Sequence, residues 1–308
     1  MGICDVLYIV VPSYNEKDVL PETAKRLKEK VNSLIYGKKI APGSRIVFVN
    51  DGSVDSTWEI IKELHANDKL FSGINLSCNR GHQNALLAGL MTVMNCADVS
   101  ISMDADLQDD INAVDKMLDK YYDGCDIVYG VRSKRDKDTF FKRATAEGFY
   151  KFMELMGAKV IFNHADYRLM SKRALEGLKE FEEVNLFLRG LIPMIGYKSA
   201  TVEYERGERF AGESKYPLRK MLAFAFEGIT SLTIMPIRLI GFVGAIVMGI
   251  GVFMLLFGAG LILSSVWFIG GLQLLCIRII GEYLGKTYME TKARPKFIVE
   301  EFINIPGD

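Results

Sequence analysis

The longest uncharged stretch of the chain runs from Leu239 to Ile277 and contains no aspartate, glutamate, lysine or arginine. As a single helix it would be about 58 Å long, nearly twice the roughly 30 Å hydrocarbon thickness of a bilayer. Two helices of about 20 residues, reversing near Gly258–Gly260, fit that thickness better. The segment therefore predicts a transmembrane helical hairpin. The alternative is a buried helix pair in a water-soluble fold, but such a pair normally carries polar residues on its outer face.

Basic residues flank this segment on both sides, and none lies within it. They are Arg219, Lys220 and Arg238 before it, and Arg278, Lys286, Lys292, Arg294 and Lys296 after it. The positive-inside rule then places both flanks in the cytoplasm. The N-terminus has no basic region followed by a long apolar run, so we expect no signal peptide and a first half that folds in the cytoplasm.

The charges and cysteines restrict the class of protein further. Lysine plus arginine and aspartate plus glutamate each total 38, so the formal net charge at pH 7 is zero. This balance argues against nucleic acid as a partner, because such proteins usually carry a basic excess. The five cysteines include no Cys-x-x-Cys pair, which favours free thiols in a reducing compartment over disulfides or a zinc site.

The first half of the chain alternates short β-branched runs with helical patterns, which predicts an α/β fold with a parallel sheet covered by helices. The expected strands are Leu7–Val11, Arg45–Val49, Gly73–Leu76, Val99–Met103 and Asp126–Tyr129. The expected helices are Val19–Leu34, Thr57–Ala66, Asn84–Asn95, Ala144–Leu155 and Ser171–Phe181. A polar or glycine-bearing motif follows each strand, at the sheet edge where such folds bind ligands.

Two of these motifs carry acids. Asp104 and Asp106 follow the fourth strand, and their carboxylates are the hard oxygen ligands that Mg²⁺ and Mn²⁺ prefer. A metal there would bridge two phosphates and stabilise a departing diphosphate; Gln108 adds a further oxygen. Asp51 follows the second strand, where it would either accept hydrogen bonds from a base or ribose, or form an Asx-turn that caps the next helix.

Three motifs occur together in the order and spacing of a known family: Pro12–Glu16, Asn50–Thr57 and Met103–Asp109. The chain resembles the family-2 glycosyltransferases, most closely their polyprenyl-phosphate branch, which includes dolichyl-phosphate mannosyltransferases and bacterial undecaprenyl-phosphate glycosyltransferases. Further matching segments are Asn79–Ala85, Gly130–Arg132, Asp166–Met170, Arg209–Pro217 and Ile280–Lys286. The resemblance covers nearly the whole chain. It departs at Asp110, where the branch often has proline, and in the short connection within the hairpin.

The resemblance implies a domain organisation. Residues 1–215 would form a cytoplasmic, Rossmann-like GT-A domain, and residues 216–236 juxtamembrane amphipathic helices. Residues 237–281 would form the two transmembrane helices, and residues 282–308 a cytoplasmic tail. The protein would be a multi-pass protein of the bacterial cytoplasmic membrane with its catalytic domain facing the cytoplasm. Relatives suggest a homo-oligomer such as a tetramer.

The resemblance also implies roles for individual residues. Asp104 would act beside the donor sugar, and the nucleotide-sugar pocket would contain Pro12, Tyr14, Glu16, Asp51 and Asp104. Asp106 and Gln108 would hold Mg²⁺ or Mn²⁺. Asp166 would lie beside the acceptor, either as a base or to orient Arg168 or the acceptor. The acceptor phosphate would be bound by Arg132, Arg206, Arg209, Ser214 and Lys215. These basic residues also suit anionic lipid headgroups, at about 1 kcal/mol each. We expect His82 to have a loop or helix-start role.

The implied function is a metal-dependent, inverting hexosyltransferase that moves a sugar from a nucleotide-sugar, UDP-linked rather than GDP-linked, to undecaprenyl phosphate for cell-envelope glycan modification. A phosphate monoester is mostly ionised at neutral pH, since its second pKa is near 6, and hardly needs a general base. Two alternatives stay open: transfer to a glycolipid or a growing glycan, and a non-catalytic membrane-bound sugar-nucleotide sensor. A transporter is disfavoured because the apolar segment lacks charged residues.

Overall fold

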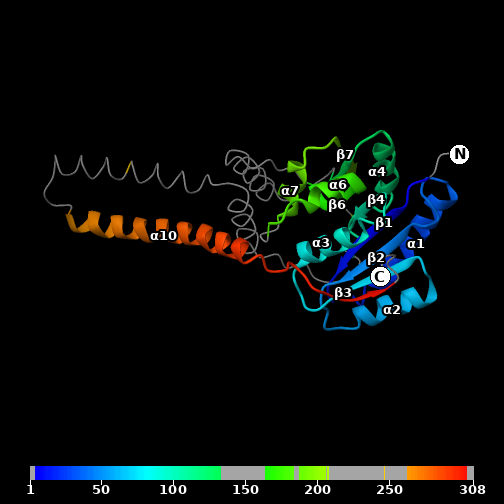
Figure 1. Ribbon diagram of the computed structural model, residues 1–308, viewed down its shortest axis with the longest axis horizontal. Coiled ribbons are helices and arrows are strands. Elements are labelled where there is room, and N and C mark those ends of the chain that lie inside the picture. The colour runs from blue at the N-terminus through cyan, green and yellow to red at the C-terminus, as the bar shows by residue number, and fades with distance from the viewer. Residues whose placement is uncertain are drawn as a thin grey trace.

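The computed structural model describes residues 4–132, 164–183, 187–205, 207, 246 and 262–303. They form a layered α/β domain, from which one long helix, α10 (Ile262–Lys292), extends (Figure 1). The domain is built on one eight-stranded sheet with the order β7-β5-β6-β4-β1-β2-β3-β8.

The centre of the sheet is parallel and contains the four buried strands that open the chain. They are β1 (Leu7–Ser13), β2 (Arg45–Asn50), β3 (Phe71–Leu76) and β4 (Val99–Ser102). β1 lies between β2 and β4 and pairs in parallel with both. Together with β5 (Ile127–Arg132), these strands confirm all five that the sequence predicts.

The parallel arrangement predicted for the first half of the chain is confirmed, but the sheet as a whole is mixed, because two later strands run antiparallel to the others. β6 (His164–Ser171) lies antiparallel between β4 and β5, and β7 (Ser199–Tyr204) pairs in parallel with β5. β8 (Val299–Ile303) pairs antiparallel with β3. The sequence indicated the parallel centre because buried parallel strands are continuous apolar runs, whereas β6 carries His164, Asp166 and Arg168 among its apolar residues.

Helices cover both faces of the sheet. The helices that the structure describes in the domain are α1 (Leu20–Tyr36), α2 (Thr57–Asn67), α3 (His82–Val93), α4 (Ala113–Tyr122), α6 (Lys172–Lys179) and α7 (Leu188–Met194). One core contains residues of α1, α2 and α4, and the other contains residues of α3, α6 and α7. Side chains of β1 alternate between the two cores, as a pleated strand requires.

Four of the predicted helices are confirmed as α1, α2, α3 and α6, and Ala144–Leu155 lies outside the described residues. α3 packs unusually close to the sheet at Gly89. A Cβ atom there would lie 2.4 Å from Val10 Cγ1, so any side chain would push the helix away. This contact fixes the position of α3, whose first turn reaches the carboxyl edge of the parallel strands.

Most of the predicted membrane region lies outside the described residues, including residues 216–236 and all of 237–261 except Ile246. Among the helices that are described, none combines the length and the apolar character that crossing a bilayer requires. The predicted boundary after residue 281 falls inside α10. The predicted tail is also not a separate segment, because β8 returns to the sheet and pairs with β3.

Candidate active site

Two loops meet where β1 and β2 end, and Asn15 joins them. The Asn15 N–H donates to Ser53 Oγ at 3.0 Å, and Asn15 Oδ1 accepts from the Val54 N–H at 3.0 Å. Asn15 has a φ of 54°, a left-handed conformation that asparagine tolerates. Of the residues predicted for the nucleotide-sugar pocket, Tyr14 is exposed, Glu16 is half-buried and Pro12 is buried in β1. Tyr14 and Glu16 therefore border the end of the sheet.

Asp51 has a role that neither of the two predicted alternatives describes. Its side chain is buried, and its two oxygens accept the backbone N–H groups of Arg80 at 2.7 Å and Gly81 at 2.9 Å. Gly52, with a φ of 62°, packs so closely that a Cβ would lie 2.5 Å from the Asn79 nitrogen. Burial raises the pKa of Asp51, and the two N–H groups oppose that rise. Asp51 thus holds the loop that leads into α3. Because its carboxylate is almost fully covered, little of it is open to contact by a nucleotide.

The acidic loop that follows β4 contains the predicted metal ligands. Asp106 is 7% exposed, and its Oδ1 accepts the Gln108 N–H at 3.1 Å. Leu107 between them has a φ of 58°, which is uncommon for a residue other than glycine. Asp109 is buried and accepts a hydrogen bond of 2.5 Å from the Tyr204 hydroxyl. Two carboxylates of the loop are therefore held in place by hydrogen bonds.

These carboxylates lack full compensation for their charge. Burial raises the pKa of Asp104, and the nearby His82 opposes the rise. Burial and the Asp104 charge raise the pKa of Asp109 to about 6. In the described part of the chain, Asp104 Oδ1 and Asp109 Oδ2 are buried without a hydrogen-bond partner. A divalent cation relieves this kind of electrostatic imbalance, so the residues present fit Mg²⁺ or Mn²⁺.

The described residues supply few ligands for a metal ion. The described residues contain no cluster of three or more histidine, cysteine, aspartate or glutamate side chains arranged to hold a metal ion. Mg²⁺ sites commonly use one or two carboxylates and complete the shell with water and substrate phosphates. Asp106 and Gln108 would therefore hold the ion only together with a diphosphate. The ion would then bind when the nucleotide-sugar donor binds.

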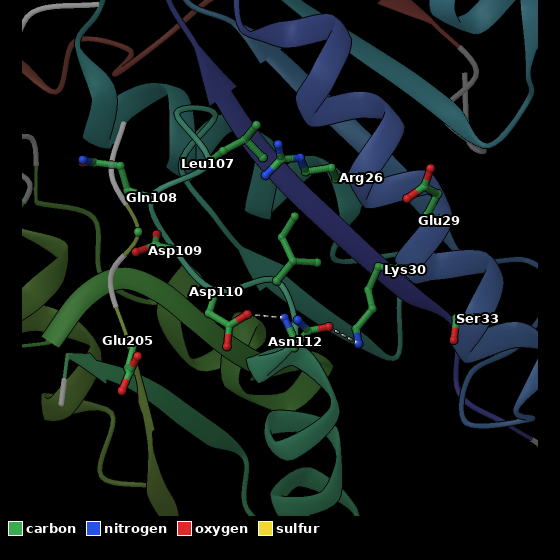
Figure 2. A pocket seen from close by; sticks show the side chains of 12 residues that line it. Arg26, Glu29, Lys30, Ser33, Leu107, Gln108, Asp109, Asp110, Asn112 and Glu205 are labelled. Atoms are coloured by element: carbon green, nitrogen blue, oxygen red, sulfur yellow. Dashed lines mark hydrogen bonds between the residues drawn. The ribbon is translucent and has the colours of Figure 1, made fainter. Parts of the chain in front are cut away.

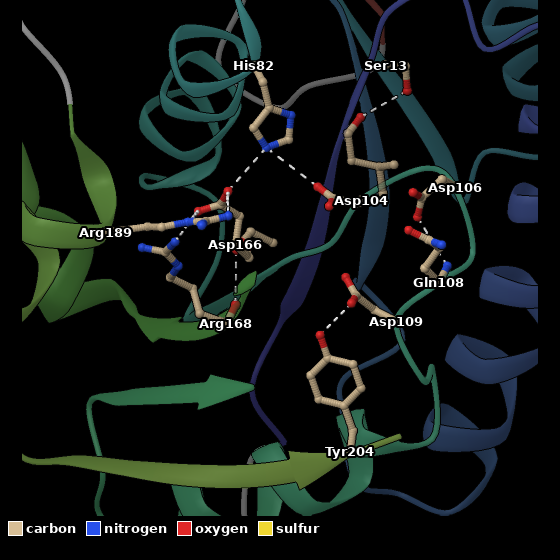
Figure 3. Close-up of polar contacts among 12 residues, drawn as sticks. Ser13, His82, Asp104, Asp106, Gln108, Asp109, Asp166, Arg168, Arg189 and Tyr204 are labelled. Carbon is tan, nitrogen blue, oxygen red and sulfur yellow. Dashed lines mark hydrogen bonds and ion pairs between the residues drawn. The ribbon is translucent and has the colours of Figure 1, made fainter. Parts of the chain in front are cut away.

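Asp166, on β6, forms a second charged group opposite Asp104. Arg168 Nη2 donates to Asp166 Oδ1 at 2.6 Å, and Arg189 Nη2 donates to Asp166 Oδ2 at 3.0 Å. The His82 ring stands between the two acids, with Nε2 lying 3.5 Å from Asp104 Oδ1 and 3.7 Å from Asp166 Oδ2 (Figure 3). The structure therefore brings together Asp104 and Asp166, which lie 62 positions apart in the sequence.

The charges around Asp166 determine what its carboxylate can do. Burial alone would raise its pKa, but the guanidinium groups of Arg189 and Arg168 outweigh burial and hold it well below its usual range. A carboxylate with so low a pKa is a weak proton acceptor. Of the two roles considered for Asp166, this geometry suits orienting arginine better than acting as a base.

Sequence reasoning missed Arg189, whereas His82 begins α3 as expected and in addition lies near two acids of the site. Arg189 begins α7 in an apolar run, Leu186-Phe187-Leu188-Arg189-Gly190-Leu191, which belongs to none of the matching motifs. A single arginine among apolar residues was the available signal, because a cation in an apolar segment needs a partner. His82 lies in a motif, but its neighbours in space come from β4 and β6.

The predicted acceptor-phosphate residues are only partly described. Arg132 ends β5, and its Nε donates to the Tyr204 hydroxyl at 3.4 Å. Arg206, Arg209, Ser214 and Lys215 lie outside the described residues. Gly207, which lies between Arg206 and Arg209, is tied to the acidic loop, because its N–H donates to the Gln108 carbonyl at 2.8 Å.

A polar cavity of about 640 Å³ lies between α1 and the acidic loop (Figure 2). Arg26 and Lys30 of α1 line one side, and Gln108, Asp109 and Glu205 line another. Gln108 and Asp109 therefore belong both to this cavity and to the acidic loop.

Comparison with known proteins identifies the family. The model of glycosyl transferase family 2 matches residues 8–178, which include all of β1 except its first residue, β2–β6, and the acids Asp51, Asp104, Asp106, Asp109 and Asp166. The chain belongs to glycosyl transferase family 2. Residues 1–215 were predicted to form such a domain, and the fold is the α/β, Rossmann-like arrangement expected of it, with a mixed sheet.

Several relatives of this glycosyl transferase match almost its whole length. An uncharacterized glycosyltransferase, YkoT, from Bacillus subtilis is 53% identical and is aligned over 96% of this chain and 91% of its own. The prophage bactoprenol glucosyl transferase homolog of Escherichia coli is 38% identical, over 95% of this chain and 97% of its own. The bactoprenol glucosyl transferase of Shigella phage SfX is 36% identical and is aligned over 95% of this chain and 98% of its own. All three relatives are named as glycosyltransferases or glucosyl transferases.

Proposed function

We propose that this glycosyl transferase moves a sugar from a nucleotide-sugar to the phosphate of a polyprenyl lipid. The observation that carries the proposal is that an acidic group and a group with net positive charge lie on opposite sides of the His82 ring. The acidic loop with Asp104 and Asp106 lies on one side, and Asp166 with its two arginines lies on the other. Relatives named bactoprenol glucosyl transferase, aligned over nearly the full chain, support a polyprenyl phosphate acceptor.

The donor side is assigned to the loops after β1, β2 and β4. Tyr14 and Glu16 border the end of the sheet where the nucleotide would lie, and we favour a UDP-linked donor. Asp106 and Gln108 would hold Mg²⁺ or Mn²⁺ against the diphosphate, where the ion supplies charge neutralisation for the leaving group.

The proposed reaction is a single displacement. An oxygen of the acceptor phosphate forms a bond to the anomeric carbon while the bond from that carbon to the diphosphate oxygen breaks, so the anomeric configuration inverts. The acceptor phosphate is mostly ionised at neutral pH, so no proton has to leave during the attack. The residues of this chain then contribute orientation: Asp104 beside the sugar, and Asp166 through its arginines.

A membrane-bound acceptor requires the site to lie near a bilayer. We propose that residues 239–277 form the membrane hairpin and that the domain faces the cytoplasm. The sheet supports an even number of crossings, because β7 before the segment and β8 after it belong to the same sheet. A chain that leaves a domain and returns to it must cross a membrane an even number of times. A hairpin satisfies this condition and a single span does not.

The test is a transfer assay with the purified full-length protein in detergent. It would receive Mg²⁺ or Mn²⁺, undecaprenyl phosphate and a panel of labelled UDP- and GDP-sugars. We expect one UDP-sugar to give label that is soluble in organic solvent and is released by mild acid. Label in an acid-stable product would instead indicate a glycolipid or glycan acceptor. Binding of a nucleotide-sugar without any transfer would indicate a sensor.

A further inference from the structure

The group formed by Asp166, Arg168 and Arg189 carries an excess of positive charge. Two guanidinium groups contact the single carboxylate, at 2.6 Å from Arg168 and at 3.0 and 3.3 Å from Arg189. One carboxylate can offset one of these charges, so the group as a whole has one net positive charge. A structural ion pair would be complete with one arginine.

The two arginines differ in what they can reach. The side chain of Arg168 is fully covered, and its Nε and Nη1 have no hydrogen-bond partner within the described part of the chain. Arg168 therefore contributes its charge to Asp166 but cannot contact a ligand that approaches from solvent. The side chain of Arg189 is 31% exposed. Arg189 is thus the member of the group that presents the excess charge to solvent.

The surroundings of Arg189 indicate what this charge is for. Asp104, Asp106 and Asp109 make the facing loop strongly acidic, and Asp104 is joined to Asp166 through His82. A phosphate monoester that approached the sugar here would be repelled by these acids unless a cation received it. The planar guanidinium of arginine suits phosphate oxygens, because it can donate two parallel hydrogen bonds.

We propose that Arg189 receives the phosphate of the acceptor, and that Asp166 is a positioning residue that holds Arg189 in place rather than a general base. The identity of this phosphate as that of a polyprenyl lipid rests on the proposed function. The role of Arg189 as a phosphate ligand does not, because it follows from the charge and exposure of the group.

The first experiment measures binding rather than turnover. A short-chain polyprenyl phosphate is titrated into the full-length protein in detergent by calorimetry, and UDP with Mg²⁺ is titrated separately. We expect Arg189→Gln to weaken binding of the prenyl phosphate at least about tenfold while UDP binding stays within about twofold. Arg189→Lys should restore part of the affinity. Unchanged prenyl phosphate binding in Arg189→Gln, or a loss confined to UDP, would overturn the proposal.

A matched control is available on α6. Arg173 also pairs with an aspartate, Asp126, at 3.5 Å, but its side chain is 66% exposed and it belongs to a different charged group. Arg173→Gln should leave both affinities unchanged. Thermal unfolding of each variant shows whether the fold is intact, and Arg189→Lys keeps the test valid if the glutamine variant is unstable.

The second experiment separates positioning from base catalysis at Asp166. If Asp166 acts through Arg189, Asp166→Asn should weaken prenyl phosphate binding by a similar factor to Arg189→Gln, and the double variant should be little worse than either single one. The pH dependence of kcat between about pH 6 and pH 9 should keep its shape in Asp166→Asn. Intact prenyl phosphate binding with a large loss of kcat in Asp166→Asn would show that Asp166 is a base.

The two proposals fail in different ways. If the wild-type protein transfers no sugar to polyprenyl phosphate but loses prenyl phosphate binding in Arg189→Gln, the proposed function is wrong and the role of Arg189 stands. If the wild-type protein transfers sugar and Arg189→Gln binds prenyl phosphate normally, the proposed function stands and the role of Arg189 is wrong.

Discussion

At the scale of single residues, the acids of this site differ in how far neighbouring groups compensate their negative charge. Asp166 is compensated twice, by Arg168 and Arg189, whereas Asp104 and Asp109 each keep a buried oxygen without a hydrogen-bond partner among the described residues. A buried carboxylate that lacks compensation is costly. The acidic loop therefore carries an excess of negative charge, whereas Asp166 and its two arginines together carry one net positive charge.

Asp106→Ala should abolish transfer while leaving the protein folded. Because Asp106 would be a direct ligand, we expect a loss of activity greater than about 100-fold. Transfer assays and metal titrations measure the effect, and circular dichroism checks the fold. The control is Asp119→Ala, which removes an exposed acid of α4 that pairs with Lys39. This variant should behave like the wild type. Normal turnover in Asp106→Ala would contradict the metal assignment.

Tyr204→Phe should raise the concentration of Mg²⁺ or Mn²⁺ needed for half-maximal activity. The change removes the hydrogen bonds of the Tyr204 hydroxyl with Asp109 and Arg132 and leaves the ring in its edge-on contact with Tyr167. A lost hydrogen bond to a buried charged group costs about 1.5–3 kcal/mol, and part of this should loosen the acidic loop. Tyr8→Phe removes a buried hydroxyl of β1 and serves as the control. Equal metal dependence in both variants would show that Tyr204 does not support the loop.

The sequence indicated some residues of the site better than others. Asp104 and Asp106 were found because they directly follow an apolar strand, and strand ends converge at one edge of a parallel sheet. The partners of Asp51 could not be found in this way, because Arg80 and Gly81 are about 30 positions away and contact it through backbone atoms. Arg189 was missed because its importance depends on β6, which the sequence pattern did not indicate.

At the scale of elements, the least expected feature is the return of the chain to the sheet as β8. Glu301 accepts a hydrogen bond from Trp58 Nε1 at 3.1 Å and pairs with Lys62 at 3.1 Å, so β8 also contacts α2. The central strands were predicted because burial on both faces makes them continuously apolar. β8, with the sequence Val-Glu-Glu-Phe-Ile, is an edge strand, and its pattern resembles that of an exposed tail.

Phe302→Pro should detach β8 and expose the edge of β3. Phe302 pairs with Ile74, and proline cannot donate to a strand ladder. We expect amide hydrogen exchange in β3 to become at least about tenfold faster, while β1 stays protected. Glu301→Gln, which weakens a half-exposed ion pair, should change stability by less than about 1 kcal/mol. Slow exchange of β3 in Phe302→Pro would show that β8 contributes little to the sheet.

At the scale of the whole molecule, the proposed hairpin lies between two segments of one domain. Truncation after Ser231 would remove the apolar segment but also β8, so its effects would mix loss of a membrane anchor with damage to the sheet. The topology is better tested by chemical labelling, which leaves the chain intact.

Gly258→Cys and Glu300→Cys should be labelled from opposite sides of the membrane. Each substitution is made in a chain whose five native cysteines are replaced, and intact cells are treated with a maleimide that cannot cross membranes. We expect Gly258→Cys, at the turn of the hairpin, to be labelled in intact cells, and Glu300→Cys, in β8, only after lysis. Labelling of both positions on the same side would contradict a spanning hairpin.

The central claim is that the sugar becomes bonded to a lipid phosphate, and the product itself tests it most directly. The donor selected by the transfer assay is labelled with carbon-13 at its anomeric carbon, and the purified lipid product is studied by carbon and phosphorus NMR. We expect the labelled carbon to couple to a single phosphorus atom of a phosphodiester, with an anomeric configuration opposite to that of the donor. A product whose labelled carbon shows no coupling to phosphorus would contradict the account.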